Sequence, residues 1–141
     1  MRKALKITIF LAVLAMPSAA LAANSSQPQA INCQSLKFKP AKIILSCGDG
    51  GTWLGKLRWS SWTNTQAVAN GNYTANNCTP SCVAGHTHST AVKVTLSKPK
   101  LCPGQVNPAF KQAVFTYKGT KPKGAPSKYT FKCPQGLPGA Y

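Results

Sequence analysis

Apolar and polar residues alternate with a period of two along most of this chain, and residues that favour turns separate the alternating segments. Successive side chains of a β-strand point to opposite faces of a sheet, so this pattern predicts strands. No segment carries an uninterrupted apolar stripe at helical spacing of useful length. We therefore expect an all-β protein with about seven short strands.

Individual segments make this prediction more specific. Trp53, Leu57 and Trp59 are expected on one face of a strand, with Trp62 on the opposite face and exposed. The dipeptide Asn70-Gly71 predicts a tight hairpin turn, because both residues adopt positive φ readily. One face of a later, long strand is expected to carry His86, His88, Thr90, Val92, Val94 and Leu96.

The number and length of the strands suggest a fold. Seven or so short strands in about 100 residues favour an antiparallel, disulfide-stapled β-sandwich of immunoglobulin-like size. A small β-barrel is the alternative. We expect a single β domain over residues 31–133, a flexible segment over 23–30 before it and a flexible Gly/Pro-rich tail over 134–141 after it.

Residues 1–22 have the features of a signal peptide for export. Arg2, Lys3 and Lys6 precede an apolar run over 7–16, and Ala20-Leu21-Ala22 supplies the small residues that a signal peptidase recognises. This run is too short to span a bilayer as a helix, which needs about 20 residues. We therefore expect a secreted or periplasmic protein that has no transmembrane segment and is a monomer.

The cysteines agree with export. All six follow the predicted signal, and an even number in a small exported chain indicates a disulfide framework. We expect Cys78 and Cys82 to pair across a short loop, and the other four to link the N-terminal strands and the C-terminal third. The full set is Cys33, Cys47, Cys78, Cys82, Cys102 and Cys133.

The charge is almost entirely of one sign, because 17 Lys and Arg residues stand against a single acid, Asp49. Removal of the signal takes away three of the 17 and leaves lysines together with Arg58. One carboxylate excludes catalysis by paired carboxylates, and the sequence has neither a Gly-x-Ser-x-Gly nucleophile motif nor a phosphate-binding loop. We therefore expect a binding protein rather than an enzyme, without a cofactor.

An excess of lysine favours diffuse attraction to polyanions, because bidentate recognition of phosphates and bases relies more on arginine. The expected partner is an anionic envelope polymer, a host polyanion or an anionic membrane surface, without sequence-specific recognition of nucleic acid. An effector or antimicrobial that acts on anionic membranes is an alternative, and solubility alone also explains the charge. The lysines expected to bind the polyanion are Lys98, Lys100, Lys118, Lys121, Lys123, Lys128 and Lys132.

The stretch between residues 59 and 92 contains no Lys, Arg, Asp or Glu and raises two further hypotheses. Trp62 and Tyr73, surrounded by amides and hydroxyls, are candidates for stacking on the sugar rings of a glycan. His86 and His88 point the same way on a strand and are weak candidates for holding a metal ion, with the cysteines of the short loop as further ligands. Export favours a disulfide there, so neither a metal site nor a metal-assisted enzyme is expected.

Four segments of the central region carry a distinctive pattern: Cys47-Gly48-Asp49-Gly50, Trp59-Ser60-Ser61-Trp62, Gly71-Asn72-Tyr73 and Asn77-Cys78-Thr79-Pro80-Ser81-Cys82. This pattern resembles a group of small exported bacterial proteins that have no assigned activity. The resemblance extends over residues 40–97 and implies an exported bacterial β domain. It implies no functional residue.

Overall fold

The computed structural model describes residues 26–135, so the predicted export signal and residues 136–141 of the predicted tail lie outside it. The described chain is all-β and contains three disulfides, which confirms the predicted fold class. Within this part of the chain there is no helix that could cross a membrane. The strands are β1 (Gln29–Asn32), β2 (Ser35–Lys37), β3 (Ile43–Ile44), β4 (Thr52–Trp62), β5 (Gln66–Asn76), β6 (Thr87–Leu101), β7 (Pro108–Tyr117) and β8 (Lys128–Thr130).

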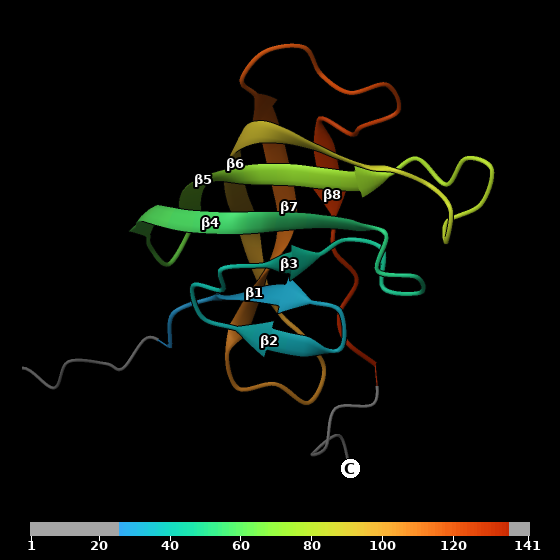
Figure 1. The fold of residues 1–141 in the computed structure, drawn as a ribbon. Coiled ribbons are helices and arrows are strands. Elements are labelled where there is room, and N and C mark those ends of the chain that lie inside the picture. Colours follow the sequence, from blue (N-terminus) through green and yellow to red (C-terminus); the bar gives the residue numbers. More distant parts are fainter. Residues whose placement is uncertain (1–25, 136–141) are drawn as a thin grey trace, which may run out of the picture.

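Four long strands, β4 to β7, form an antiparallel meander that makes up most of the molecule (Figure 1). One edge of β7 pairs with β6, and its other edge is shared by two short strands. β1 runs parallel to β7 beside Ala109 and Phe110, whereas β8 pairs with β7 from Gln112 to Val114. β1 and β8 thus pair with different parts of the same edge of β7. We call the point where they diverge, near Lys111, the fork. The antiparallel strand β2 extends the sheet beyond β1.

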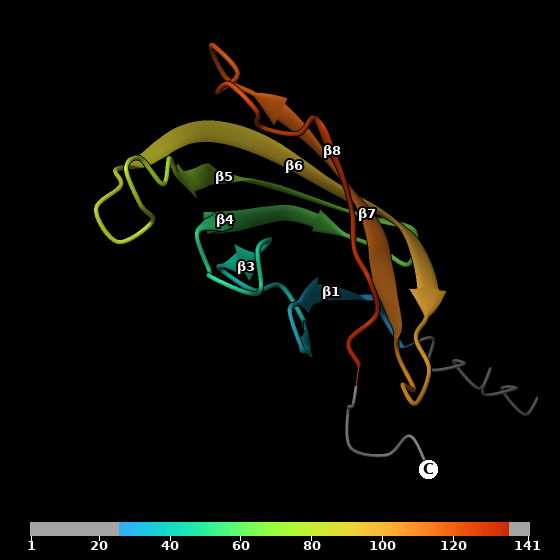
Figure 2. The ribbon, with the colours of Figure 1, turned by 90° about the vertical axis from the view of Figure 1, so that its right-hand side faces the viewer.

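The sheet curls until β3, at one end of the strand order, lies beside β1, near the other end (Figure 2). The side chain of Asn32 joins them: its Nδ2 donates to the carbonyl oxygen of Lys42 at 3.3 Å, and its Oδ1 accepts from the backbone N–H of Ile44 at 2.9 Å. The Cys33–Cys47 disulfide links the same two regions. Side chains thus join these edges where the sheet has no backbone ladder.

One curled sheet replaces the two separate sheets of the expected sandwich, and it is closer to the small-barrel alternative. The physical reason is the length of the strands, because β4 to β7 each contain 10 to 15 residues. Strands of this length bend and coil with the natural twist of the sheet, so one continuous sheet curls over the core.

The long strand predicted from the alternation is β6. Val92, Val94 and Leu96 are completely buried, and they lie opposite β7 residues on the inner face of the sheet. His88 is exposed near the start of the strand, and His86 precedes it. Alternation therefore identified the buried face of β6, while the first residues of this strand extend beyond the core.

Two bulges in β4 change which of its side chains face the core. The pairing with β5 shifts after Gly55 and again after Trp59, and each shift inserts one residue. Trp62 therefore shares the inner face with Trp59, at 4.5 Å between ring centroids, while Trp53 lies on the opposite face. Trp62 is 8% exposed, and its indole N–H donates to the carbonyl oxygen of Pro28 at 2.9 Å. The prediction of an exposed Trp62 is wrong, because it assumed unbroken alternation.

The predicted hairpin turn at Asn70-Gly71 is also wrong. β5 runs through both residues without interruption, and Gly71 pairs with Val92 of β6. The glycine is required by a close approach rather than by a turn, because a Cβ there would lie 2.7 Å from the carbonyl oxygen of Gly55. The connection between β4 and β5 is made instead near Thr63, whose hydroxyl accepts from the backbone N–H of Gln66 at 3.1 Å.

The described residues at both ends of the chain make packed contacts, and β1 begins at Gln29, two residues before the predicted start of the domain. Pro28 is fully buried, and the next residue begins β1. At the other end Pro134 is buried, and the backbone N–H of Gln135 donates to Oε1 of Gln34 at 3.1 Å. Short segments of this kind show too little alternation for a strand or a packed end to be recognised in the sequence.

Candidate functional site

The basic side chains cover the surface with almost no acid among them. Between residues 26 and 135, every Lys and Arg is exposed except the half-buried Lys111, and Asp49 is the one acid. The Asp49 carboxylate accepts from the backbone N–H of Gly51 at 2.9 Å. This bond, followed by a weaker contribution from Ser46, lowers the pKa of Asp49, so the group is ionised at neutral pH. One carboxylate leaves nearly all of the described cations without an acidic partner.

The seven lysines predicted to bind a polyanion do not form one site. Lys118, Lys121 and Lys123 lie in the loop between β7 and β8, and Lys128 begins β8. Lys100 pairs with Ala109 near the opposite end of β7, and Lys98 lies beside it in sequence. At 3.3 Å per residue along β7, Lys100 is separated by about 30 Å from Lys118 and by about 17 Å from Lys128, whose partner is Val114. Lys132 belongs to neither group and lines a pocket described below.

The loop between β7 and β8 is anchored to the sheet by hydrogen bonds. The backbone N–H of Lys118 donates to the carbonyl oxygen of Ala91 at 2.9 Å. The hydroxyl of Tyr117 donates to the carbonyl oxygen of Pro126 at 2.8 Å. Ala125, a residue of the loop itself, is buried at 6% exposure. Nζ of Lys121 donates to the hydroxyl of Ser127 at 3.3 Å. The lysines of this loop are therefore presented from an ordered backbone.

Strand pairing adds two cations that the sequence did not point out as binding residues. A single row across the outer face of the sheet contains Arg58, Asn70, Lys93 and Thr116, one from each of β4 to β7. Lys128 lies on the same face, because its partner on β7 is two residues from Thr116. Lys118 directly follows β7 and is two residues from Thr116. We define the basic surface as Arg58, Lys93, Lys118, Lys121, Lys123 and Lys128.

Lys111 differs from the other lysines because it is half-buried without an acidic partner. Its Nζ lies 3.2 Å from Sγ of Cys133, which forms a disulfide with Cys102. Burial lowers the pKa of Lys111, and the charge of nearby Lys100 lowers it further. Lys111 lies in the first half of β7, two residues from Ala109, the partner of Lys100.

The glycan hypothesis fails because both of its aromatic residues are in the core. Trp62 is 8% exposed and Tyr73 is 6% exposed. The ring of Tyr73 packs 6.2 Å from Phe115 and 5.7 Å from Tyr117, measured between centroids. Burial raises the pKa of Tyr73 and, together with the charge of Tyr73, raises the pKa of Tyr117 to about 12. Neither Trp62 nor Tyr73 is available to stack on a sugar.

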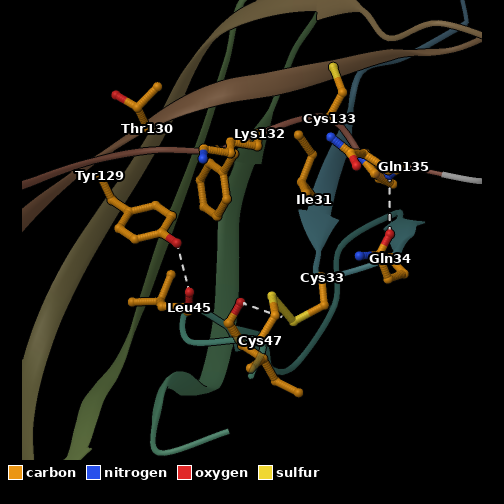
Figure 3. Close-up of a pocket in the computed structure, with 13 residues that line it drawn as sticks. Ile31, Cys33, Gln34, Leu45, Cys47, Tyr129, Thr130, Lys132, Cys133 and Gln135 are labelled. Atoms are coloured by element: carbon orange, nitrogen blue, oxygen red, sulfur yellow. Dashed lines mark hydrogen bonds between the residues drawn. A yellow bond between two sulfur atoms is a disulfide. The ribbon is translucent and has the colours of Figure 1, made fainter. Parts of the chain in front are cut away.

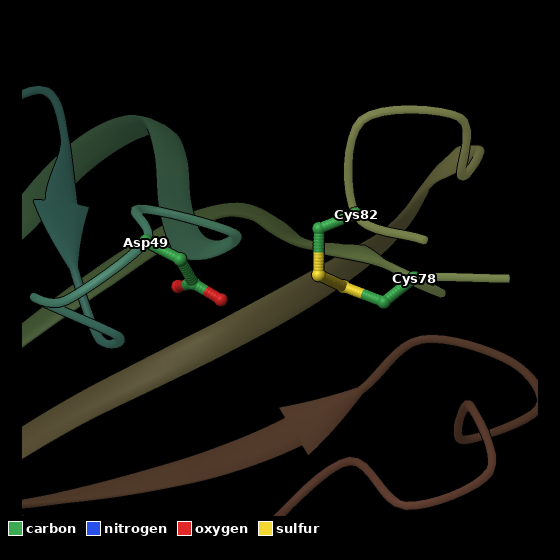
Figure 4. A group of neighbouring side chains, drawn as sticks. All are labelled: Asp49, Cys78 and Cys82. Carbon is green, nitrogen blue, oxygen red and sulfur yellow. A yellow bond between two sulfur atoms is a disulfide. The ribbon is translucent and has the colours of Figure 1, made fainter. Parts of the chain in front are cut away.

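The Cys78–Cys82 disulfide is formed, as predicted from the short spacing (Figure 4). In the described part of the chain, one group of three potential metal ligands has its ligand atoms within 4.8 Å of one another, and it consists of Asp49, Cys78 and Cys82. Neither His86 nor His88 belongs to it. Sulfurs joined in a disulfide are not thiolates, which are the form that binds metals, so this group does not fit a metal ion while it is oxidised.

A pocket of about 390 Å³ opens where the edge of β7 forks between β1 and β8 (Figure 3). It was not expected from the sequence, because its walls come from segments about 100 residues apart. Its lining includes both cysteines of the Cys33–Cys47 disulfide and Cys133 of the Cys102–Cys133 disulfide. The lining residues are Ile31, Cys33, Gln34, Ile44, Leu45, Cys47, Tyr129, Thr130, Phe131, Lys132, Cys133, Pro134 and Gln135.

Comparison with known proteins gives no family assignment. No family model matches the chain. No curated protein matches it, and no solved structure matches it. The placement, exposure and charge of its own residues are therefore the observations that bear on function.

Proposed function

We propose that this protein is exported and binds anionic polymers, such as envelope polymers or host polyanions, through the basic surface. The observation that carries the proposal is the arrangement of six exposed cations on neighbouring strands and one anchored loop, with no acid among them. The three disulfides support a secreted or periplasmic location, because disulfides persist in oxidising compartments.

The composition of the surface favours attraction to charge rather than recognition of a sequence. Five of the six residues are lysines, which act as mobile point charges, and Arg58 alone offers a planar guanidinium. Binding of such a surface to a polyanion releases condensed counterions, so affinity falls steeply as salt rises. On duplex DNA, used as a polyanion of defined charge, each phosphate contact contributes about 0.9 to the slope of log K against log salt.

The test compares two variants that lose the same charge from opposite ends of the molecule. In the first, Lys93, Lys118, Lys121 and Lys123 are replaced by Gln. In the second, the control, Lys37, Lys39, Lys98 and Lys100 are replaced by Gln. All eight side chains are exposed, so the two variants should fold alike and have equal net charge.

Elution from immobilised heparin and titration of labelled duplex DNA of mixed sequence give the result. We expect the first variant to elute at lower salt than the control, and its DNA slope to fall by about 3 to 4 if each lysine contacts one phosphate. If the two variants elute at the same salt concentration, and both at a lower one than the wild type, the binding depends on net charge alone. Early elution of the wild-type protein would mean that the charge serves solubility, and either result refutes the proposed surface.

A second candidate function is binding to an anionic membrane surface through the turn between β6 and β7. Leu101 is 62% exposed and Val106 is 88% exposed, and Lys98 and Lys100 lie beside them in sequence. Apolar side chains flanked by lysines suit the interface of an anionic bilayer. Replacement of Leu101 and Val106 by Ser should weaken sedimentation with phosphatidylglycerol vesicles.

The matched control for this second function is Val83→Ser, because Val83 is 100% exposed in a loop that has no charged residue. Equal sedimentation of this control and the double variant would contradict a role for the turn. A dye-leakage assay on the same vesicles separates an effector that perforates membranes from a protein that only binds them, since a binder leaves the vesicles intact.

A further inference from the structure

The pocket at the fork of β7 combines an apolar floor with a single charged lining residue. Ile31, Leu45 and Phe131 line it and are 3%, 7% and 5% exposed. Their buried side chains come from β1, from the segment after β3 and from the segment after β8. Lys132 is exposed among the lining residues, and Asp49 is not one of them. The pocket therefore offers apolar contact and one uncompensated positive charge.

Hydrogen bonds across the pocket hold its walls in place. The hydroxyl of Tyr129 donates to the carbonyl oxygen of Leu45 at 2.6 Å, which ties β8 to the segment after β3. On the other side the backbone N–H of Gln135 donates to Oε1 of Gln34 at 3.1 Å (Figure 3). This bond also fixes the side-chain amide of Gln34, whose NH₂ group is a further donor in the lining. A ligand would thus meet a pocket that is already formed.

We propose that this pocket binds a small anionic amphiphile, such as a short acyl chain or a bicyclic ring that carries one carboxylate or sulfonate. A volume of about 390 Å³ is near the lower end of small-molecule sites, which measure about 300 to 1,000 Å³. The apolar part of the ligand packs on the floor, and its acidic group lies beside Lys132, where no carboxylate of the lining competes for the ammonium. This activity goes beyond polymer binding and uses none of the six residues of the basic surface.

The first arm of the test asks whether the pocket is the site. 1-Anilinonaphthalene-8-sulfonate, an aromatic sulfonate built on a naphthalene ring, is titrated into the oxidised protein, and decanoate below its micellar concentration is used as competitor. Gln135 lines the pocket and is exposed, and it bonds to Gln34 through its backbone N–H, so Gln135→Trp should fill the opening while keeping this bond. The control is Thr116→Trp, which places the same ring on an exposed position of β7 that does not line the pocket.

We expect one saturable site in the wild type, an affinity at least tenfold weaker in Gln135→Trp and an affinity within twofold in Thr116→Trp. Wild-type affinity in Gln135→Trp, or equal loss in both variants, would overturn the proposal. Thermal unfolding of each variant establishes that it is folded before the titrations are compared.

The second arm asks whether Lys132 recognises the acid. Lys132→Gln should weaken decanoate about five- to tenfold, as expected for one charge-assisted hydrogen bond at a partly exposed site, and should leave neutral decanol unchanged. The control Lys128→Gln removes an exposed lysine of β8 that is not in the lining and should leave both ligands unchanged. Equal weakening of decanoate in both variants would overturn the role of Lys132.

The outcome is independent of polymer binding. The variant that lacks Lys93, Lys118, Lys121 and Lys123 should bind the naphthalene probe as the wild type does, because none of these residues lines the pocket. Failure on heparin with normal probe binding would refute the proposed function alone. Normal heparin binding with no saturable probe site would refute the pocket alone.

Discussion

Gly71→Ala adds one methyl group at the point where β4 and β5 approach each other most closely. Gly71 lies in the middle of β5, opposite the first bulge of β4. The new Cβ would lie 2.7 Å from the carbonyl oxygen of Gly55 and 2.8 Å from Cδ2 of Leu57. A backbone oxygen cannot rotate away, and Leu57 is only 5% exposed. The two strands must therefore separate locally to admit the methyl group.

The cost follows from the kind of contact that is broken. Over-packing of a folded core costs about 1–3 kcal/mol. A clash with backbone cannot be relieved by a rotamer change, so we expect about 2–3 kcal/mol in the free energy of unfolding. For a domain of roughly 110 residues, 1 kcal/mol corresponds to about 4 °C, so Tm should fall by about 8–12 °C.

Thermal unfolding followed by near-UV circular dichroism, with the disulfides oxidised, measures this change. The matched control is Gly48→Ala, because a Cβ at Gly48 meets no atom within 4 Å. Its Tm should stay within about 2 °C of the wild type, as for surface substitutions in general. A wild-type Tm for Gly71→Ala would refute both the uninterrupted β5 and the close approach at the bulge. Asn70→Thr then separates a turn from a strand, since only a strand tolerates threonine there.

Three further changes probe other parts of the fold. Trp62→Phe removes the hydrogen bond to Pro28 and should lower the free energy of unfolding by about 1–2 kcal/mol in urea titrations, more than Trp53→Phe does. Asn32→Ala leaves the backbone N–H of Ile44 without its partner and should cost about 1–3 kcal/mol in the same titrations. The pKa of Tyr117 is about 12 in the folded protein against 10 in the unfolded chain, so stability should be lost as pH rises from 10 to 12, and Tyr117→Phe should flatten this fall in Tm.

Local patterns in the sequence were sufficient to predict the all-β fold class and one of the disulfides. β6 has a buried inner face because its alternation continues from Val92 to Leu96 without an inserted residue. The Cys78–Cys82 pair could be predicted because only three residues separate the two cysteines. In both cases the information lies within a few neighbouring residues, so no knowledge of the partner strands is needed.

Features that depend on two strands at once could not be predicted. The bulges after Gly55 and Trp59 become apparent only when β4 is placed against β5, and they bury Trp62 instead of exposing it. Strand register likewise brings Arg58 and Lys93 into one row, although 34 residues of sequence lie between them. The same long-range pairing separates Lys98 and Lys100 from the lysines of the loop between β7 and β8, and it creates the pocket at the fork.

Charge and stability are linked in this protein. The basic residues far outnumber the single acid, so they repel one another in the compact state, and this repulsion lowers the stability of the fold. The Cys33–Cys47 and Cys102–Cys133 disulfides, with sequence separations of 14 and 31, restrict the unfolded chain and offset the repulsion by about 3–4 kcal/mol each. A polyanion on the basic surface neutralises part of the charge in the folded state, so its binding also stabilises the fold. Variants in which these lysines are neutral lose repulsion and so gain stability, but they bind a polyanion less tightly. For this reason the position of the removed charge, rather than its amount, distinguishes a binding surface from a charge that only maintains solubility.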